Sequence, residues 1–135
     1  MTRSGTGKAV IESVEIYAGK TQVRALLSGD SATIRVAGSA QSALEELTVG
    51  ILIRDRLGND VFGTNTHHHK LTRYQIPEGA EFSIDFCFAS LPLGSGSYSV
   101  SVALHSSHTH LEANYDWWDK ALVFKVLPGR QPYSV

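Results

Sequence analysis

Residues 47–66 constrain the fold most strongly, because they read as two strands joined by a tight turn. Val49, Ile51 and Ile53 alternate with other residues, which is the period of a strand with one buried face. Residues 56–60 then supply Gly, Asn and Asp, which adopt the positive φ angles of hairpin turns. The apolar pattern resumes after the turn. The segment therefore predicts a β-hairpin, with strands over 47–54 and 60–66, in an all-β protein.

Alternating apolar segments separated by turn residues recur along the rest of the chain. They cover residues 9–17, 23–27, 32–36, 82–88, 98–104 and 122–126. About eight short strands at this spacing are typical of an antiparallel β-sandwich or barrel. Helical spacing is confined to residues 40–47, which are too few to carry a domain. The prediction is one domain over residues 1–135, with a core over 8–128 and a weakly ordered polar tail over 129–135.

Composition excludes several classes of partner. The chain has 135 residues, of which 42% are hydrophobic and 19% charged, as in folded soluble domains. Its net charge of −1 predicts no binding to nucleic acid or to anionic membranes. The sequence holds neither an apolar run near the ~20 residues that span a bilayer nor an apolar signal core at its start, which predicts a cytoplasmic protein without direct membrane insertion. Cys87 is the only cysteine, so no internal disulfide is expected, and it reads as a small strand residue.

Motifs for nucleotide binding and catalysis are not supported by their spacing. Residues 4–8 invite comparison with a phosphate-binding loop, but Thr2 stands where that motif requires its first glycine. The chain has no Gly-x-Ser-x-Gly elbow. The acidic pairs Glu45–Glu46 and Asp116/Asp119 read as solvated turns rather than as a general acid and base. The sequence therefore predicts a protein that is not an enzyme and needs no cofactor.

Six histidines form two clusters, over residues 67–69 and at His105, His108 and His110. In an extended segment the first and third histidines of the trio lie on one side, and so do His108 and His110. Two such pairs supply the four nitrogen ligands of a metal site. We favour solvated loop histidines with hydrogen-bonding roles, because no cysteine and few carboxylates accompany them. A metal site and direct contact with a ligand are the alternatives.

Both tryptophans lie in the aromatic run 115–119, just before the last predicted strand. Flat aromatic faces stack on the C–H faces of sugar rings, and nearby carboxylates and amides bind ring hydroxyls. The alternative is that an indole caps the core. Because Trp117 and Trp118 are adjacent, we expect one to point outward and the other inward.

One face of the predicted sheets carries small outward residues. They are Gly50, Ser83, Cys87, Ser99, Ser101 and Ala103, with Arg54, Asp85 and His105 at the rim. If these strands are neighbours, the face is flat or concave. It reads as a solvated face, as a packing surface for a second subunit, or as a groove for a glycan.

The chain resembles the C-terminal domain of Wzt-type ATP-binding subunits of polysaccharide ABC transporters. The most specific match is Gly-Thr-Asn-Thr at residues 63–66, and weaker matches cover 5–16, 29–36, 50–62, 94–98 and 115–126. The resemblance implies an immunoglobulin-like sandwich that recognises the finished O-antigen chain at its modified end. It also implies a homodimer, which could form by exchange of the C-terminal strand between two copies. The implied partners are an ATP-binding domain and a membrane permease. The chain is expected to be either an excised domain or a free-standing relative.

The resulting hypothesis is non-catalytic binding of a bacterial surface polysaccharide. The predicted carbohydrate-binding residues are Trp117, Trp118, Tyr115, Asn65, Arg54, Asp85, Ser101 and His105. The alternative is a structural dimerisation domain that binds no glycan.

Overall fold

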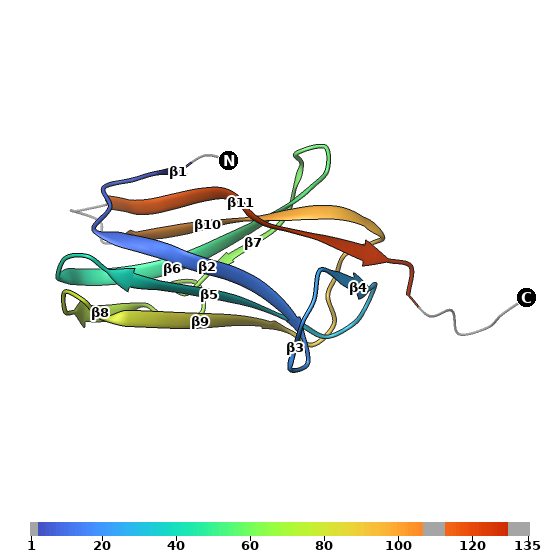
Figure 1. The fold of residues 1–135 in the computed structure, drawn as a ribbon, viewed down its shortest axis with the longest axis horizontal. Helices are drawn as coiled ribbons and strands as arrows, with labels where there is room; N and C mark the ends of the chain where they lie inside the picture. Colours follow the sequence, from blue (N-terminus) through green and yellow to red (C-terminus); the bar gives the residue numbers. More distant parts are fainter. Residues whose placement is uncertain (1–2, 107–112, 130–135) are drawn as a thin grey trace, which may run out of the picture.

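The computed structural model describes residues 3–106 and 113–129, which form two β-sheets that face each other (Figure 1). The strands are β1 Arg3–Ser4, β2 Ala9–Ala18, β3 Thr21–Gln22, β4 Ala25–Leu27, β5 Ala32–Ala40, β6 Leu44–Asp55, β7 Asp60–Asn65, β8 Arg73–Ile76, β9 Glu81–Phe88, β10 Gly96–Ser106 and β11 Ala113–Leu127. Eight of these eleven strands have four residues or more. The predicted immunoglobulin-like, antiparallel β-sandwich is confirmed, and the predicted hairpin corresponds to β6 and β7.

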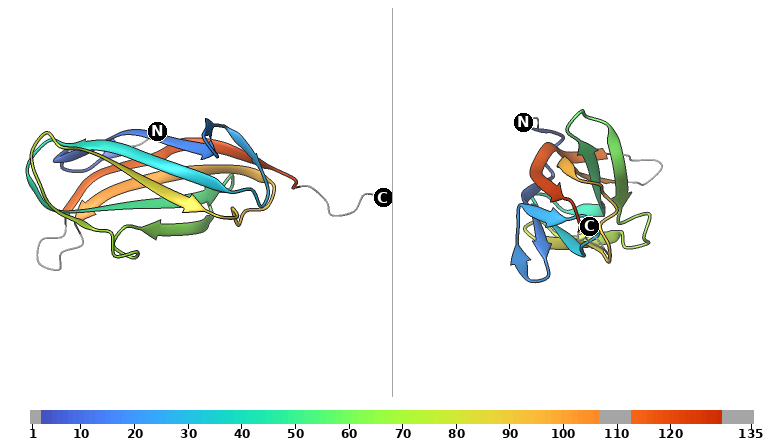
Figure 2. Two further views of the ribbon diagram at one scale, coloured as in Figure 1. Left: turned by 90° about the horizontal axis from the view of Figure 1, so that it is seen from below. Right: turned by 90° about the vertical axis from the view of Figure 1, so that its right-hand side faces the viewer.

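The two sheets differ in size and both run along the long axis of the molecule (Figure 2). The seven-stranded sheet has the order β1-β11-β10-β6-β7, with β4 beside the end of β11 and β8 beside the start of β6. The other sheet has the order β3-β2-β5-β9. All pairings are antiparallel except that of β4 with β11. Consequently β7 and β9 are edge strands of their respective sheets.

The core lies between the sheets and is built from alternate residues of each strand. From the larger sheet, Ile53 and Val100 are fully buried, and Ile34 and Val36 from the smaller sheet are buried equally. Each such side chain contributes about 1.5–3 kcal/mol when it leaves water. Because side chains alternate along a strand, the residues between these positions on β6 and β10 point away from the core. They form the outer face of the seven-stranded sheet.

The helical spacing noted at residues 40–47 does not form a helix. β5 continues to Ala40 and β6 begins at Leu44, where it pairs with Ile76 of β8. Eight residues are too few for a stable helix in water, whereas pairing with β8 satisfies the backbone groups of this segment. None of the described residues is helical, so no helix among them is long and apolar enough to cross a bilayer.

The aromatic run at 115–119 lies within the last strand, not before it as predicted. β11 pairs with β10 along most of its length, but the register shifts twice, between Leu104 and His105 and between Val100 and Val102. At the first shift β11 has one extra residue, Tyr115, which reverses the alternation of inward and outward side chains, and at the second shift residues 119–121 lie opposite Ser101 alone. The strand signal is therefore lost from the sequence. The predicted tail beyond Gly129, together with His108 and His110, lies outside the described residues.

Candidate functional site

Four strands of the larger sheet place one row of residues across its outer face. The register pairs Trp117 with Ala103, Ala103 with Gly50, and Gly50 with Asn65. Directly paired residues project to the same side of a sheet. The indole of Trp117 and the amide of Asn65 therefore face outward with two small residues between them. The space above these residues is a shallow depression of about 320 Å³, lined by Gly50, Ile51, Leu52, Gly63, Thr64, Asn65, His68, His105 and Trp117.

Gly50 forms the floor of this depression. A Cβ atom added there would lie 3.5 Å from Asn65 Cβ, 3.6 Å from the Thr64 carbonyl oxygen and 4.0 Å from His105 Nε2. These are ordinary van der Waals distances, so glycine is not required by the backbone. The absence of a side chain at Gly50 deepens the surface between the Asn65 amide and the His105 imidazole.

The Gly-Thr-Asn-Thr segment at residues 63–66 builds the β7 side of the depression. The Thr66 side chain is buried, and its hydroxyl oxygen accepts a hydrogen bond from the Val49 backbone N–H at 2.9 Å. Asn65 Oδ1 accepts a hydrogen bond from the backbone N–H of His68 at 2.6 Å, which closes the turn that follows β7. An amide side chain commonly stabilises a turn in this way. The turn positions His68 at the rim of the depression.

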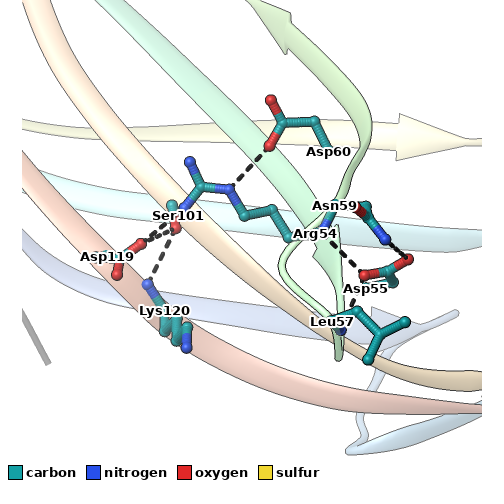
Figure 3. Close-up of polar contacts among 8 residues, drawn as sticks. All are labelled: Arg54, Asp55, Leu57, Asn59, Asp60, Ser101, Asp119 and Lys120. Carbon is teal, nitrogen blue, oxygen red and sulfur yellow. Dashed lines mark hydrogen bonds and ion pairs between the residues drawn. The ribbon is translucent and has the colours of Figure 1, made fainter.

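Arg54, Asp60 and Asp119 form an ion-pair network (Figure 3). It lies on the same face as the depression, because Arg54 and Gly50 point to the same side of β6. Arg54 Nε lies 2.9 Å from Asp60 Oδ1, and Arg54 Nη1 lies 3.1 Å from Asp119 Oδ1. The Ser101 hydroxyl donates to Asp119 Oδ1 at 2.8 Å and accepts from the Lys120 backbone N–H at 3.0 Å. Lys120 has a φ of 53°, in the left-handed region that non-glycine residues rarely adopt. The network thus holds the bulge of β11 that follows Trp117.

The turn between β6 and β7 is stabilised by the carboxylate of Asp55. It accepts hydrogen bonds from the backbone N–H groups of Asn59 and Leu57, each at 2.9 Å, and from the Asn59 side-chain amide at 3.1 Å. These bonds favour the ionised form, those from Asn59 most strongly, and they lower the pKa of Asp55. The turn fixes the hairpin that carries Arg54 and Asp60.

Five of the predicted site residues share this outer face: Arg54, Asn65, Ser101, His105 and Trp117. Ser101 has no exposed surface, because its hydroxyl is covered by its bonds to Asp119 and Lys120. Asn65, His105 and Trp117 line the depression itself, whereas Arg54 lies in the adjoining network. Sequence reasoning did not assign His68 or Gly63 to the site, although both lie in segments that it singled out.

The other three predicted residues lie elsewhere. Tyr115 is buried in the core, its hydroxyl donates to the Glu46 carbonyl oxygen at 2.9 Å, and burial raises its pKa. Trp118 points to the opposite side from Trp117 and packs against the core, and its ring centroid lies 4.3 Å from the guanidinium carbon of Arg3. Asp85 is on β9 of the smaller sheet, where its carboxylate oxygens accept bonds of 2.8 and 3.1 Å from Arg35.

The predicted face of small residues is divided between the two sheets. Gly50, Ser99, Ser101 and Ala103 share the outer face of the larger sheet, because β6 and β10 are neighbours. Ser83 and Cys87 belong to β9 in the other sheet, so their inclusion in one face was wrong. Alternation assigns a residue to a buried or an exposed side, but it does not say which sheet holds the strand.

Two histidines of the 67–69 cluster, His67 and His69, form hydrogen bonds with neighbouring threonine hydroxyl groups. Thr64 Oγ1 lies 2.8 Å from His69 Nε2, and Thr72 Oγ1 lies 3.4 Å from His67 Nδ1. Within residues 3–106 and 113–129, no three or more His, Cys, Asp or Glu residues are grouped so as to hold a metal ion. His67 and His69 belong to the turn that follows β7, whereas His105 lies on β10.

Comparison with known proteins identifies the family of the chain. A family model described as the Wzt C-terminal domain matches residues 1–134. A crystal structure of the C-terminal domain of wzt is similar, with a TM-score of 0.84 and 19% identity over 98% of this chain and 81% of that chain. A Niemann-Pick type C2 protein from Japanese carpenter ant has a related fold, with a TM-score of 0.62 and 6% identity over 94% of this chain and all of that chain. No curated protein matches the chain. The chain therefore belongs to the Wzt C-terminal domain family, a family of binding domains related to O-antigen ABC transporters.

Proposed function

We propose that the domain binds a sugar unit of a bacterial O-antigen polysaccharide in the depression on the outer face of the seven-stranded sheet. In this proposal the domain recognises the finished or modified end of the polysaccharide for export by the ABC transporter and performs no chemistry on the polysaccharide. The observation that carries the proposal is the row Trp117, Ala103, Gly50 and Asn65. It places an aromatic ring and an amide on either side of a floor without bulky side chains.

The chemistry of the depression suits a sugar. The indole of Trp117 supplies an apolar wall for the C–H face of a pyranose, and His68, His105 and Asn65 supply polar groups for ring hydroxyls. A volume of about 320 Å³ is at the lower end of small-ligand sites. The depression is therefore matched to one or two sugar units rather than to a long stretch of polymer.

Binding to a single depression is expected to be weak. A hydrogen bond to a sugar hydroxyl replaces one to water, so its net contribution is only about 1 kcal/mol. A homodimer with two depressions would raise the affinity for a polymer through effective concentration. We include in the proposal a homodimer, a cytoplasmic location, and association with the ATP-binding domain and permease of the exporter.

An array of bacterial O-antigen polysaccharides tests the proposal directly. The wild-type protein is expected to bind at least one polysaccharide, and Trp117→Ala is expected to lose that binding. Tyr74→Ala is a matched control, because Tyr74 is an exposed aromatic residue of the same sheet that does not line the depression. Failure of the wild type to bind any polysaccharide, or equal binding by Trp117→Ala, contradicts the proposal.

A structural dimerisation domain is the second candidate, and a group of exposed apolar residues favours it. Val123 and Leu127 of β11 are 56% and 46% exposed, and Leu27 of β4, which is paired with Leu127, is 38% exposed. Light scattering on Val123→Glu measures whether a charge on this surface prevents dimerisation. Val123 is the better choice than Ser101, because Ser101 is buried and its substitution would disturb the fold. If the variant is monomeric and no polysaccharide binds the wild type, this second candidate is correct.

A further inference from the structure

A second cavity opens on the side of the sandwich where both sheets end. β7 is the last strand of one sheet and β9 the last strand of the other, and their inward side chains face each other across the gap. The gap holds a cavity of about 460 Å³, lined by Phe62, Thr64, Thr66, His69, Leu71, Ile84, Asp85, Phe86, Cys87 and Phe88. Thr64 is the one lining residue that it shares with the depression.

The walls of this cavity are mostly apolar. Phe62 of β7 and Phe88 of β9 meet edge to face with ring centroids 5.3 Å apart, which joins the two sheets. Ile84 and Phe86 complete the β9 wall, and Leu71, which is 62% exposed, lies at the lip. Aromatic and aliphatic side chains of this kind are the usual lining of small-molecule sites.

The polar groups of the cavity are few. The Thr64 hydroxyl and His69 Nε2 lie 2.8 Å apart and offer one hydrogen-bonding pair. Asp85 is held by two hydrogen bonds from Arg35 on the outer side of the smaller sheet, so its charge is already paired. Among the lining residues that the structure describes, Asp85 is the only carboxylate and His69 is already bonded to Thr64, so neither side chain is free to pair with a charged ligand.

We propose that this cavity binds an uncharged amphipathic small molecule, with its apolar body between the sheets and a hydroxyl or carbonyl group at Thr64 and His69. Cavities of about 150 Å³ lined by apolar side chains bind benzene. The volume here is about three times larger, which suits a molecule of two or three rings or a short alkyl chain. This site is separate from the proposed glycan site and does not depend on it.

Titration with N-phenyl-1-naphthylamine, an uncharged probe that fluoresces in apolar surroundings, tests the site. The wild-type protein is expected to bind one probe molecule per chain, with a saturable rise in emission that 1-decanol reverses. Ile84→Trp fills the cavity and is expected to weaken probe binding at least tenfold. Ser83→Trp places the same side chain on the exposed side of the same strand and should leave the affinity unchanged.

Two further measurements keep the test decisive if Ile84→Trp is unstable. Leu71→Trp changes an exposed residue at the lip of the cavity and is also expected to lower the affinity for the probe. Trp117→Ala, outside the cavity, should bind the probe as tightly as the wild type does. The proposal is overturned if the wild type shows no saturable binding, or if both filled variants bind normally. It is also overturned if probe affinity falls as protein concentration rises, because a second copy of the chain then occupies the gap. Polysaccharide binding by Leu71→Trp, measured in parallel, separates failure of this site from failure of the glycan site.

Discussion

Arg54 of β6 reaches across β10 to Asp119 of β11, with Nη1 3.1 Å from Oδ1. The two strands are not neighbours, and the buried hydroxyl of Ser101 on β10 donates to the same carboxylate oxygen. Arg54 belongs to the hairpin that carries Asn65, and Asp119 follows Trp117 by two residues. The contact therefore links the two sides of the depression.

Removal of the Asp119 carboxylate is expected to destabilise the fold. Asp119→Ala takes away the acceptor of the Ser101 hydroxyl, and a buried donor without a partner costs about 1–3 kcal/mol. The matched control is Asp60→Ala, which removes the more exposed partner of Arg54 and should cost less than about 1 kcal/mol. Urea unfolding measures both, and equal losses would show that the Ser101 contact contributes nothing.

Substitution of Gly50 separates binding from stability. Gly50→Ala meets its neighbours at 3.5 Å or more, so the melting temperature should change little, while the added methyl group raises the floor and weakens polysaccharide binding. Gly38→Ala is the contrasting variant, because a Cβ there would lie within 2.7 Å of Phe82 Cζ and even closer to the Val10 carbonyl oxygen. Overpacking of this kind costs about 1–3 kcal/mol. A Gly50→Ala protein that binds as tightly as the wild type would place the ligand elsewhere.

Tyr115→Phe is expected to affect stability but not ligand binding. The variant loses the buried hydrogen bond to the Glu46 carbonyl oxygen, at a net cost of about 0.5–1.5 kcal/mol. Tyr74→Phe, at a 64% exposed position, should have no measurable effect. Thermal unfolding and the polysaccharide array are the two measurements. If Tyr115→Phe lost glycan binding at unchanged stability, the Tyr115 hydroxyl would have to take part in glycan binding.

Acid is expected to weaken the β6–β7 turn. Hydrogen bonds from Asn59 lower the pKa of Asp55, so the folded state favours its ionised form. This contribution is fully present above the unfolded pKa of about 3.9 and is lost as the pH falls through the lower folded value. Urea midpoints measured between pH 6 and pH 2 should therefore decline less steeply for Asp55→Asn than for the wild type. Identical slopes would mean that the turn is not linked to protonation of this carboxylate.

The sequence predicts the strands better than it predicts their positions in the two sheets. Alternation locates the β6–β7 hairpin and the buried faces of β9 and β10, because each has one face in the core. It does not show that β9 lies in the other sheet, so Ser83 and Cys87 are grouped wrongly with Gly50. Sheet order depends on contacts between distant strands, which no local pattern records.

The candidate site could be predicted in part. The chemistry of Trp117, Asn65 and His105 indicates a sugar-binding surface, and the structure places all three around one depression. Tyr115 lies inside the protein because a bulge next to Leu104 disturbs the alternation of β11. Burial of Ser101 depends on a second bulge at Lys120. Bulges are invisible in the sequence, so these two roles required the structure.

Amide chemical-shift mapping with the polysaccharide that binds best in the array shows which face of the domain holds the sugar. The expected result is that the largest changes occur at Gly50, Asn65 and His105 and at the indole N–H of Trp117, all on the outer face of the seven-stranded sheet. Changes confined to Arg35 and Asp85 on the opposite sheet would mean that the sugar does not bind in the depression.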